Sequence, residues 1–476
     1  MTSLAPAALV AVCAASSLAG GAVQPRVVLN REGLAARDNV NFGAVPDTSG
    51  AIGRRYYLEA VNVRLALYKA GSLKLAASRD AYAFWHRSNV SQLVDPYVVW
   101  DDQARRYYVV MIFNGTGGRN NQLLFAWSKR TSRLNLSSSW CRMSMKVGAR
   151  FDDYPKIGFD RTHVLIGTNL FNEAQDESLT ARIWALGKPG PGNSCARLPV
   201  KVFGTPDDPL RRADGHLAFT PVPVDPAGPS QRGYVVAADC VYEPPGEEPP
   251  PCGEHSRTAN QITVWRVGGG RASPRLIREG GVDVPVYRLP TPAPQRGTRT
   301  ELDTSDTRLY QAVSAPDPSR NVPESIWTQH AVAGPGGRSE IRWYELDPSG
   351  LTVIRRGTIA SIHNWVFGGA VSPTRSGTSA VLHYVVSGRR ILPRLLLRWR
   401  GPRTPGGEMR GNLVLGRSSS AWRCGLEACP WGDYAQATPD PRRPRVVWGS
   451  NELTGVPRKA DKRVYWRTRN VAVNVP

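Results

Sequence analysis

The stretch DPYVVWDDQARRYYVVMIFNGTGGRNNQLLFAWSK, residues 95–129, contains the pattern that decides the fold of this chain. Its first half is an apolar run, a polar turn and the β-branched and aromatic run YYVVMIF, which is typical of two strands joined by a hairpin. Its second half ends in the apolar phrase LLFAWSK, which contains Trp127. The stretch therefore predicts three consecutive antiparallel strands of one sheet.

Apolar phrases like LLFAWSK, each with a Trp or Tyr near its end, recur along the whole chain. Successive aromatics of these phrases lie 55 to 81 residues apart, which is too far for a coiled coil and suits a four-stranded sheet with its turns. We expect them on equivalent third strands of seven repeated sheets. The aromatics are Tyr68, Trp127, Trp184, Trp265, Tyr344, Trp399 and, in the weakest copy, Trp466.

The element ahead of each phrase, a strand, a turn and a second strand, also recurs. No segment sustains an apolar period of about 3.6 residues, so the chain is predicted to be all-β. Seven small sheets can bury their faces by packing radially around a channel. The prediction is a seven-bladed β-propeller of four-stranded antiparallel blades, with six blades as the alternative. Clear copies occupy residues 46–62, 95–114, 153–169 and 432–451, and looser copies begin near His216, Asp306 and His363.

The two ends of the chain are expected to share the last blade. Only ten residues follow Trp466, too few for a turn and an outer strand, whereas RVVLN at residues 26–30 is an unassigned strand-like run. We expect this N-terminal strand to close the ring. Residues 240–253 and 289–300 are rich in Pro or Gly and are predicted to be surface insertions. Residues 26–476 are therefore predicted to form a single β-propeller domain.

Residues 1–25 are predicted to be a signal peptide or a flexible N-terminal segment. Residues 4–22 are small and apolar but short for a membrane span, and residues 1–25 contain no Lys or Arg. No later stretch is long and apolar enough to cross a bilayer. The expected location is secreted or extracytoplasmic.

Six cysteines follow the N-terminal segment, and an even number in an exported chain indicates disulfides. Six cysteines allow fifteen connectivities. A zinc site is the competing interpretation, but no CxxC or Cys/His spacing supports it. The expected pairs are Cys240 with Cys252, Cys424 with Cys429 and, by elimination, Cys141 with Cys195.

The chain has a formal net charge of +22, with 61 Lys and Arg against 39 Asp and Glu. A field of this size attracts polyanions such as acidic polysaccharide, teichoic acid or nucleic acid. The basic residues are scattered through strands and turns, so composition alone does not place a binding surface. No motif of a known nucleic-acid reader is present, and specific nucleic-acid recognition is not expected.

Propeller geometry predicts which face carries function. Each inner strand starts beside the channel and the second strand returns antiparallel, so the start of one and the end of the other lie on one face. At the inner-strand starts we expect a first ring of ligand-binding residues: Asp47, Asp95, Asp153, His216, Asp306, His363 and Asp433. At the second-strand ends we expect a second ring: Asn62, Asn114, Asn169, Asp239, Gln329, Ser387 and Asn451. Because Asn and Asp commonly end strands by bonding to the local backbone, the second ring is interpreted mainly as structural.

The carboxylates of the first ring repel one another unless water, a cation or a basic ligand offsets their charge. Calcium is the alternative occupant, but it needs several oxygens from adjacent positions and no DxDxDG-type loop is present. The expectation is therefore no metal and no cofactor.

The strongest catalytic candidate is DDYP, residues 152–155. A glycosidase needs two carboxyl groups roughly 5 to 10 Å apart, or a Tyr nucleophile assisted by an acid. Sequence neighbours on a strand point to opposite sides, so Asp152 is not expected to partner Asp153. GxSxG, HExxH and P-loop patterns are absent, which argues against serine hydrolase, zincin and nucleotide chemistry. The candidates for catalysis are Asp153, Tyr154, Asp95 and Asp433.

Three phrases carry a family resemblance: PDTSGAIGRRYYLEAVN (46–62), FDDYPKIGFDRTHVLIGTN (151–169) and WGDYAQATPDPRRPRVVWGSNE (431–452). They resemble the blade motifs of secreted bacterial β-propeller proteins, loosely sialidase-like. The resemblance covers nearly all of residues 26–476 and implies the propeller fold. The SxDxGxTW turn of sialidases is absent, so the resemblance does not imply sialidase activity.

The preferred functional hypothesis is a secreted, monomeric propeller that binds extracellular or envelope glycan, or another anionic polymer, through the face that carries both rings. The alternative is a glycoside hydrolase or lyase that uses carboxylates at the channel mouth. A third hypothesis is a protein-interaction platform with no small ligand.

Overall fold

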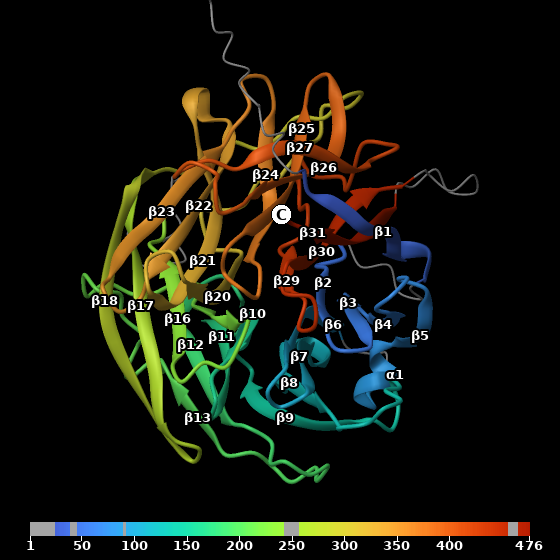
Figure 1. Cartoon of the computed structure of the whole chain (residues 1–476). Coiled ribbons are helices and arrows are strands. Elements are labelled where there is room, and N and C mark those ends of the chain that lie inside the picture. Colours follow the sequence, from blue (N-terminus) through green and yellow to red (C-terminus); the bar gives the residue numbers. More distant parts are fainter. Residues whose placement is uncertain (1–23, 39–44, 89–91, 242–256, 456–464) are drawn as a thin grey trace, which may run out of the picture.

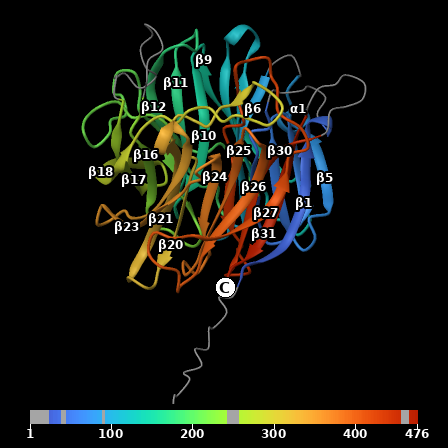
Figure 2. The same cartoon turned by 90° about the horizontal axis from the view of Figure 1, so that it is seen from above.

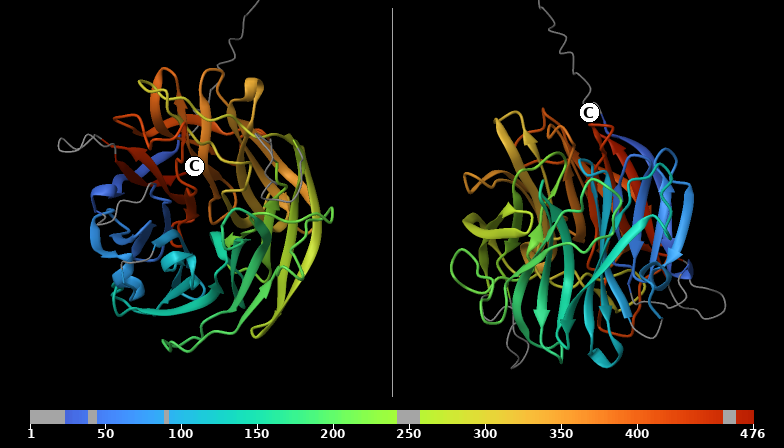
Figure 3. Two further views of the ribbon diagram at one scale, coloured as in Figure 1. Left: turned by 180° about the vertical axis from the view of Figure 1, so that it is seen from behind. Right: turned by 90° about the horizontal axis from the view of Figure 1, so that it is seen from below.

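The computed structural model describes residues 24–38, 45–88, 92–241, 257–455 and 465–476. Seven β-sheets stand around a central axis, and the chain runs once around the ring, as the colours of Figure 1 and the views from behind and below in Figure 3 show. The predicted seven-bladed propeller is confirmed, and the six-bladed alternative is wrong.

Each blade consists of four antiparallel strands, and the first strand named in each blade is the innermost. Blade 1 is β2 (Ser49–Ile52), β3 (Tyr56–Val61), β4 (Arg64–Lys69) and β5 (Leu75–Asp80), and blade 2 is β6 (Gln92–Asp101), β7 (Arg106–Asn114), β8 (Asn121–Ser128) and β9 (Trp140–Gly148). Blade 3 is β10 (Phe151–Phe159), β11 (His163–Phe171), β12 (Ser178–Gly187) and β13 (Val200–Phe203), and blade 4 is β14 (Val222–Pro223), β16 (Gly233–Ala238), β17 (Ala259–Gly270) and β18 (Ser273–Tyr287). Blade 5 is β20 (Gln311–Asp317), β21 (Val322–Ala333), β22 (Ser339–Asp347) and β23 (Thr352–Ile359), and blade 6 is β24 (Trp365–Pro373), β25 (Ala380–Gly388), β26 (Ile391–Arg400) and β27 (Arg410–Arg417). Blade 7 is β29 (Gln436–Pro439), β30 (Val446–Thr454), β31 (Trp466–Asn474) and β1 (Arg26–Ala35).

The recurring aromatics all lie on third strands, as predicted. All seven are buried in apolar clusters that neighbouring blades share; Trp127 and Trp184, for example, lie in one cluster between blades 2 and 3. A large ring on each third strand fills the widening space between two radial sheets, so the repeat in the sequence reflects the packing of the blades. Their strands are β4, β8, β12, β17, β22, β26 and β31.

The N-terminal strand closes the ring, as predicted. Strand β1 pairs antiparallel with β31, from Arg26 opposite Asn474 to Ala35 opposite Arg467. The Oγ1 of Thr468 also donates a hydrogen bond of 3.0 Å to the carbonyl of Leu34. Figures 1 and 2 show the blue β1 beside the red β31. Residues 1–23 lie outside the described residues, so the signal segment stays a prediction.

The chain enters every inner strand through a residue with a left-handed backbone. In blades 2, 3 and 6 this residue is part of a β-bulge, because the register with the second strand shifts there. The left-handed residues are Asp47, Asp95, Tyr154, Thr220, Thr307, Gly368 and Gly432.

The insertion that contains Gln295 and the one that contains Trp422 contact each other on the face where the inner strands begin. Strand β19 (Glu301–Leu302) pairs parallel with β28 (Ala428–Cys429). The Gln295 amide both accepts from the Trp422 backbone N–H (2.8 Å) and donates to its carbonyl (2.9 Å). The remaining elements are β15 (Asp225–Pro226), which pairs parallel with β20, the short helix α1 (Ala81–Trp85) and the 3₁₀ turns η1 (Ala36–Asp38), η2 (Thr116–Gly118) and η3 (Pro335–Gly337).

Two of the expected disulfides are present. Cys141 pairs with Cys195 and Cys424 with Cys429, with Cα–Cα distances of 5.1 and 5.7 Å. Cys252 lies outside the described residues, so its expected pairing with Cys240 stays a prediction. Within the described ranges, no helix has the length and apolar character needed to cross a membrane.

Candidate functional site

The ring has two faces, and each carries a candidate site. We call them the start face, where the inner strands begin, and the end face, where they end. On the start face, four carboxyl groups of the first ring gather where blades 1, 2, 3 and 7 meet the axis. We call this cluster, formed by Asp47, Asp95, Asp153 and Asp433, the carboxylate mouth.

Hydrogen bonds tie the carboxylate mouth together. The Asn62 amide donates to the Asp47 carboxylate (2.6 Å) and accepts from the Asp95 backbone N–H (2.8 Å). The Asp433 backbone N–H donates to the other Asp47 oxygen (2.8 Å), and the Tyr434 hydroxyl donates to Asp95 (3.1 Å). Asp47 and Asp95 are buried, whereas Asp153 is partly exposed and Asp433 is exposed. The first two therefore organise the mouth, and the last two are open to a ligand.

A fully buried lysine lies beneath these carboxylates. The Lys156 ammonium is 3.4 Å from the ring centre of Tyr434, 4.0 Å from that of Tyr154 and 5.1 Å from that of Tyr97. Its Nζ has no hydrogen-bond partner among the described residues. Three aromatic faces favour the charged form of this amino group by cation–π attraction, whereas its burial favours the neutral form.

Burial is the largest cause of the pKa shifts of the ionisable groups at the carboxylate mouth. Burial, and then the neighbouring Asp433, raises the pKa of Asp47 to about 7 and that of Asp153 to about 6. Burial raises the pKa of Asp95 well above its ordinary value and lowers the pKa of Lys156 well below its own. A carboxyl such as Asp153, titrating near neutral pH, can act as a general acid.

Asp306 joins the edge of the mouth through an arginine. The Arg308 guanidinium forms an ion pair with Asp306, with an Nε to Oδ1 distance of 2.6 Å, and stacks 4.3 Å from the ring centre of Tyr154. This arginine was missed in the sequence because nothing separates it from the many other arginines there.

His216 and His363 do not belong to the first ring. Both are exposed in loops that precede the inner strands, and the start positions in blades 4 and 6 belong instead to Thr220 and Gly368. The prediction was wrong because the inner-strand motif is weakest in these blades. In blade 4 the inner strand β14 is only two residues long.

The second ring is largely structural, as expected, because most of its side chains bond to backbone. The Asn169 Oδ1 accepts from the Thr220 N–H (2.6 Å), the Asn451 amide donates to the Gly368 carbonyl (2.8 Å), and the Ser387 hydroxyl donates to Pro294 (2.7 Å). Gln329 donates to the Gly369 carbonyl and Asp239 faces Arg212, whereas Asn114 Oδ1 has no partner among the described residues. These bonds join blades at the bulges.

Asp152 points away from the mouth, as the alternation of strand side chains predicted. Its carboxylate is paired with Arg182 at 3.3 Å and also accepts from the Thr168 hydroxyl (3.3 Å). The described residues contain no group of three or more His, Cys, Asp or Glu side chains arranged to hold a metal ion. The expectation about calcium stays untested.

The end face carries a cavity of about 610 Å³ between blades 1 and 2, which we call the basic groove. Its lining includes five basic side chains and no Asp or Glu, and the partly exposed rings of Tyr56 and Trp100 contribute to its wall. Arg130 is held by a hydrogen bond of 2.9 Å from its Nε to the Ala104 carbonyl. The basic side chains are Arg54, Arg55, Arg105, Lys129 and Arg130.

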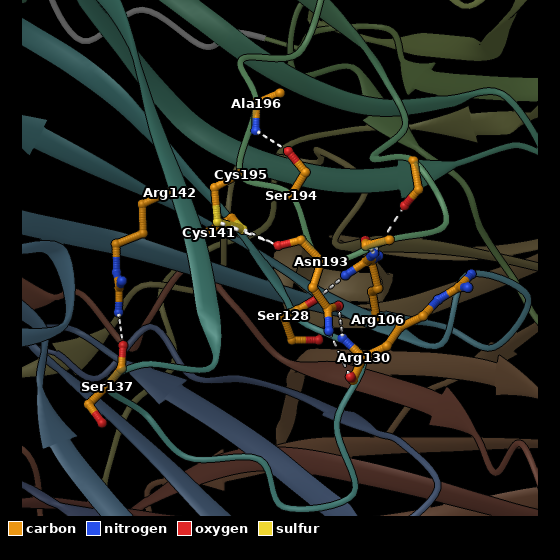
Figure 4. The surroundings of a disulfide bond; sticks show 12 residues. Arg106, Ser128, Arg130, Ser137, Cys141, Arg142, Asn193, Ser194, Cys195 and Ala196 are labelled. Carbon is orange, nitrogen blue, oxygen red and sulfur yellow. Dashed lines mark hydrogen bonds between the residues drawn. A yellow bond between two sulfur atoms is a disulfide. The ribbon is translucent and has the colours of Figure 1, made fainter.

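The disulfide between Cys141 and Cys195 supports this groove (Figure 4). It fastens the loop that contains Asn193 to β9. The Asn193 amide accepts from the Arg130 N–H (2.7 Å) and donates to the Arg130 carbonyl (3.1 Å). The carbonyls of Ser128, Gly190 and Gly192 hold the buried Arg106 guanidinium behind it. The rim of the groove is thus fixed by the cross-linked loop.

A local signal for the groove exists in the sequence. Basic residues occur in pairs at residues 54–55, 105–106 and 129–130. The first pair lies in the turn that leaves the inner strand of blade 1, the second pair spans the end of the corresponding turn of blade 2 and the first residue of β7, and the third follows the third strand of blade 2. All three pairs therefore lie on the end face. The net charge of the chain does not give this location.

Comparison with known proteins finds distant structural neighbours. No family model and no curated protein matches the chain. It is similar in structure to the Dos1 propeller, with 9% identity, a TM-score of 0.42 and coverage of 94% of each chain. It is also similar to Trypanosoma rangeli sialidase (8%, TM-score 0.40, 79% of this chain and 59% of that one) and to Drosophila Semaphorin 1b (8%, TM-score 0.39, 95% and 87%).

Proposed function

We propose that this protein binds an acidic polysaccharide in the basic groove of its end face. The observation that carries the proposal is a cavity of about 610 Å³ whose lining contains five basic side chains and no acidic one. Such a cluster attracts a polyanion both over distance and in contact. The partly exposed Trp100 and Tyr56 rings offer faces on which sugar rings can stack.

The proposal places the ligand on the face opposite the one favoured from sequence. At the carboxylate mouth a polyanion would meet the exposed Asp433 and the partly exposed Asp153. Like charges repel, so the start face disfavours the ligand that the net charge of +22 attracts.

Charge reversal in the groove is expected to weaken binding of heparin, used as a probe polyanion. Arg105→Glu with Lys129→Glu should raise Kd about tenfold or more, because each exposed ion pair contributes up to about 1 kcal/mol and each reversal adds repulsion. The slope of log Kd against log salt concentration should fall by about two. Titration at several salt concentrations measures both quantities.

Arg389→Glu with Arg390→Glu is the matched control, because it makes the same change in net charge at two exposed arginines of the turn between β25 and β26. The groove variant must lose more affinity than this control. Equal losses in the two variants would mean that net charge alone attracts the polymer and that the groove is not its site.

We further propose that the protein works as a monomer in an oxidising, extracytoplasmic compartment. The disulfides Cys141–Cys195 and Cys424–Cys429 support the location, because such bonds persist mainly outside the reducing cytosol.

A second candidate function is glycoside hydrolysis or lyase chemistry at the carboxylate mouth. The raised pKa of Asp153, about 6, favours it, because a glycosidase acid must hold its proton near neutral pH. Asp153 would protonate the leaving oxygen while Asp433 acts as the second carboxylate. A panel of chromogenic glycosides tests this function: hydrolysis that Asp153→Asn reduces at least a hundredfold supports it, and no hydrolysis by the parent protein rejects it for those substrates.

A further inference from the structure

The end face holds a second cavity at the ring axis, which we call the axial pocket. Its volume is about 260 Å³. Turns that follow the inner strands of blades 1, 2, 3, 6 and 7 line it together with residues 225–230 of blade 4. The pocket is therefore enclosed by parts of the chain that the closed ring brings together.

The axial pocket adjoins the basic groove. Both cavities are lined by Arg54, Trp100, Gln103 and Arg105. A chain that lies in the groove is thereby directed toward the axis. The pocket, at about 260 Å³, has less than half the volume of the groove, at about 610 Å³, and therefore suits a single sugar unit better than a length of polymer.

One carboxyl group in the axial pocket has unused hydrogen-bonding capacity. Asp225 is only 4% exposed and lines the pocket, yet its carboxyl forms no hydrogen bond with any described residue. The other acidic side chains there are paired: Asp101 with Lys188 (2.5 Å), Asp102 with Arg54 (2.9 Å) and Asp160 with His163 (3.3 Å). A buried polar group left open to a pocket indicates a hydrogen-bonding ligand.

A protonated Asp225 carboxyl is compatible with a polyanionic ligand. Burial, and then the neighbouring Asp101, raises the pKa of Asp225 well above its ordinary value. A neutral carboxyl donates a hydrogen bond to a hydroxyl or carboxylate oxygen and does not repel an anion.

We propose that the axial pocket binds the terminal unit of the polysaccharide whose chain lies in the basic groove, with Asp225 as its hydrogen-bonding partner. This inference rests on the proposed function. The protein then recognises the end of a polysaccharide chain. Each chain binds one copy of the protein, whatever the length of the chain.

Calorimetric titration with size-fractionated heparin oligosaccharides tests the inference. Short, medium and long fractions should each bind one protein per chain. A ratio that increases with chain length would overturn end recognition and leave groove binding intact. Absence of binding to every fraction would overturn the proposed function as well.

A pocket-filling variant gives an independent test. Gly228 lines the pocket and a Cβ added there meets no atom within 4 Å, so the position accepts a side chain, and Gly228→Trp is chosen to fill the pocket. The variant should bind the short fraction about tenfold more weakly than the parent does. Gly406→Trp is the control, because a Cβ at that exposed glycine also meets open space. Short-fraction affinity that is unchanged in Gly228→Trp would contradict the inference.

Discussion

Deletion of residues 26–32 is expected to abolish the cooperative unfolding transition of the parent protein. These residues form most of β1, which supplies the fourth strand of blade 7 and joins the two ends of the ring. Losing several ladder hydrogen bonds, at about 1 kcal/mol each, removes on the order of 5 kcal/mol. That is a large part of the stability of a typical folded domain. Urea unfolding followed by circular dichroism measures the change.

A reversible engineered disulfide, which we call the latch, distinguishes the effect of ring closure from a general loss of stability caused by the deletion. Arg26→Cys with Asn474→Cys places two cysteines at paired positions of β1 and β31. Oxidation should raise the urea midpoint of this variant by more than it raises that of the parent, in which only the native disulfides respond, because the added cross-link holds the ring shut. A deletion variant that melts like the parent, or a latch without effect, would show that β1 does not close the ring.

Titration of Asp47 is expected to lower the stability of the protein as the pH rises from 5 to 7.5. A carboxyl whose pKa is raised by folding binds more protons in the folded than in the unfolded state, so stability falls through the window between the two pKa values. For Asp47 that window runs from its ordinary pKa of 3.8 to about 7. Titration of Asp47 through this window lowers the free energy of unfolding by about 2 kcal/mol between pH 5 and 7.5. Lys156, whose pKa is lowered, contributes in the opposite direction, toward more alkaline pH.

Asp47→Asn isolates this contribution, because an amide does not titrate. The unfolding midpoint of the variant should fall less, or rise more, between pH 5 and 7.5 than that of the parent, whatever its midpoint at either pH. Asp207→Asn, at an exposed carboxyl, is the control and should keep the parent's slope. Identical slopes for Asp47→Asn and the parent would contradict the raised pKa.

The fold was predictable because the sequence repeats the same strand pattern from blade to blade. One buried aromatic on each third strand and the strand-like run at residues 26–30 sufficed to predict seven blades and their closure. The pairs Cys141–Cys195 and Cys424–Cys429 followed from counting. These features depend on local pattern and on simple arithmetic along the chain, which a single sequence displays.

The candidate site was predictable only in part, because it depends on side chains that the ring brings together. The sequence located Asp47, Asp95, Asp153 and Asp433 but not Lys156, whose cage combines Tyr97, Tyr154 and Tyr434 from three blades. Asp225 lies in the short strand β15, which has no counterpart in the other blades. Contacts between distant blades leave no local signature.

Hydrogen exchange with heparin as the probe tests the central claim most directly. The account predicts that bound heparin slows exchange of backbone amides at residues 53–56, 101–106 and 128–134, which form the basic groove, and leaves residues 152–156 and 432–434 at the carboxylate mouth unchanged. Slower exchange at the carboxylate mouth with no change in the groove would contradict it.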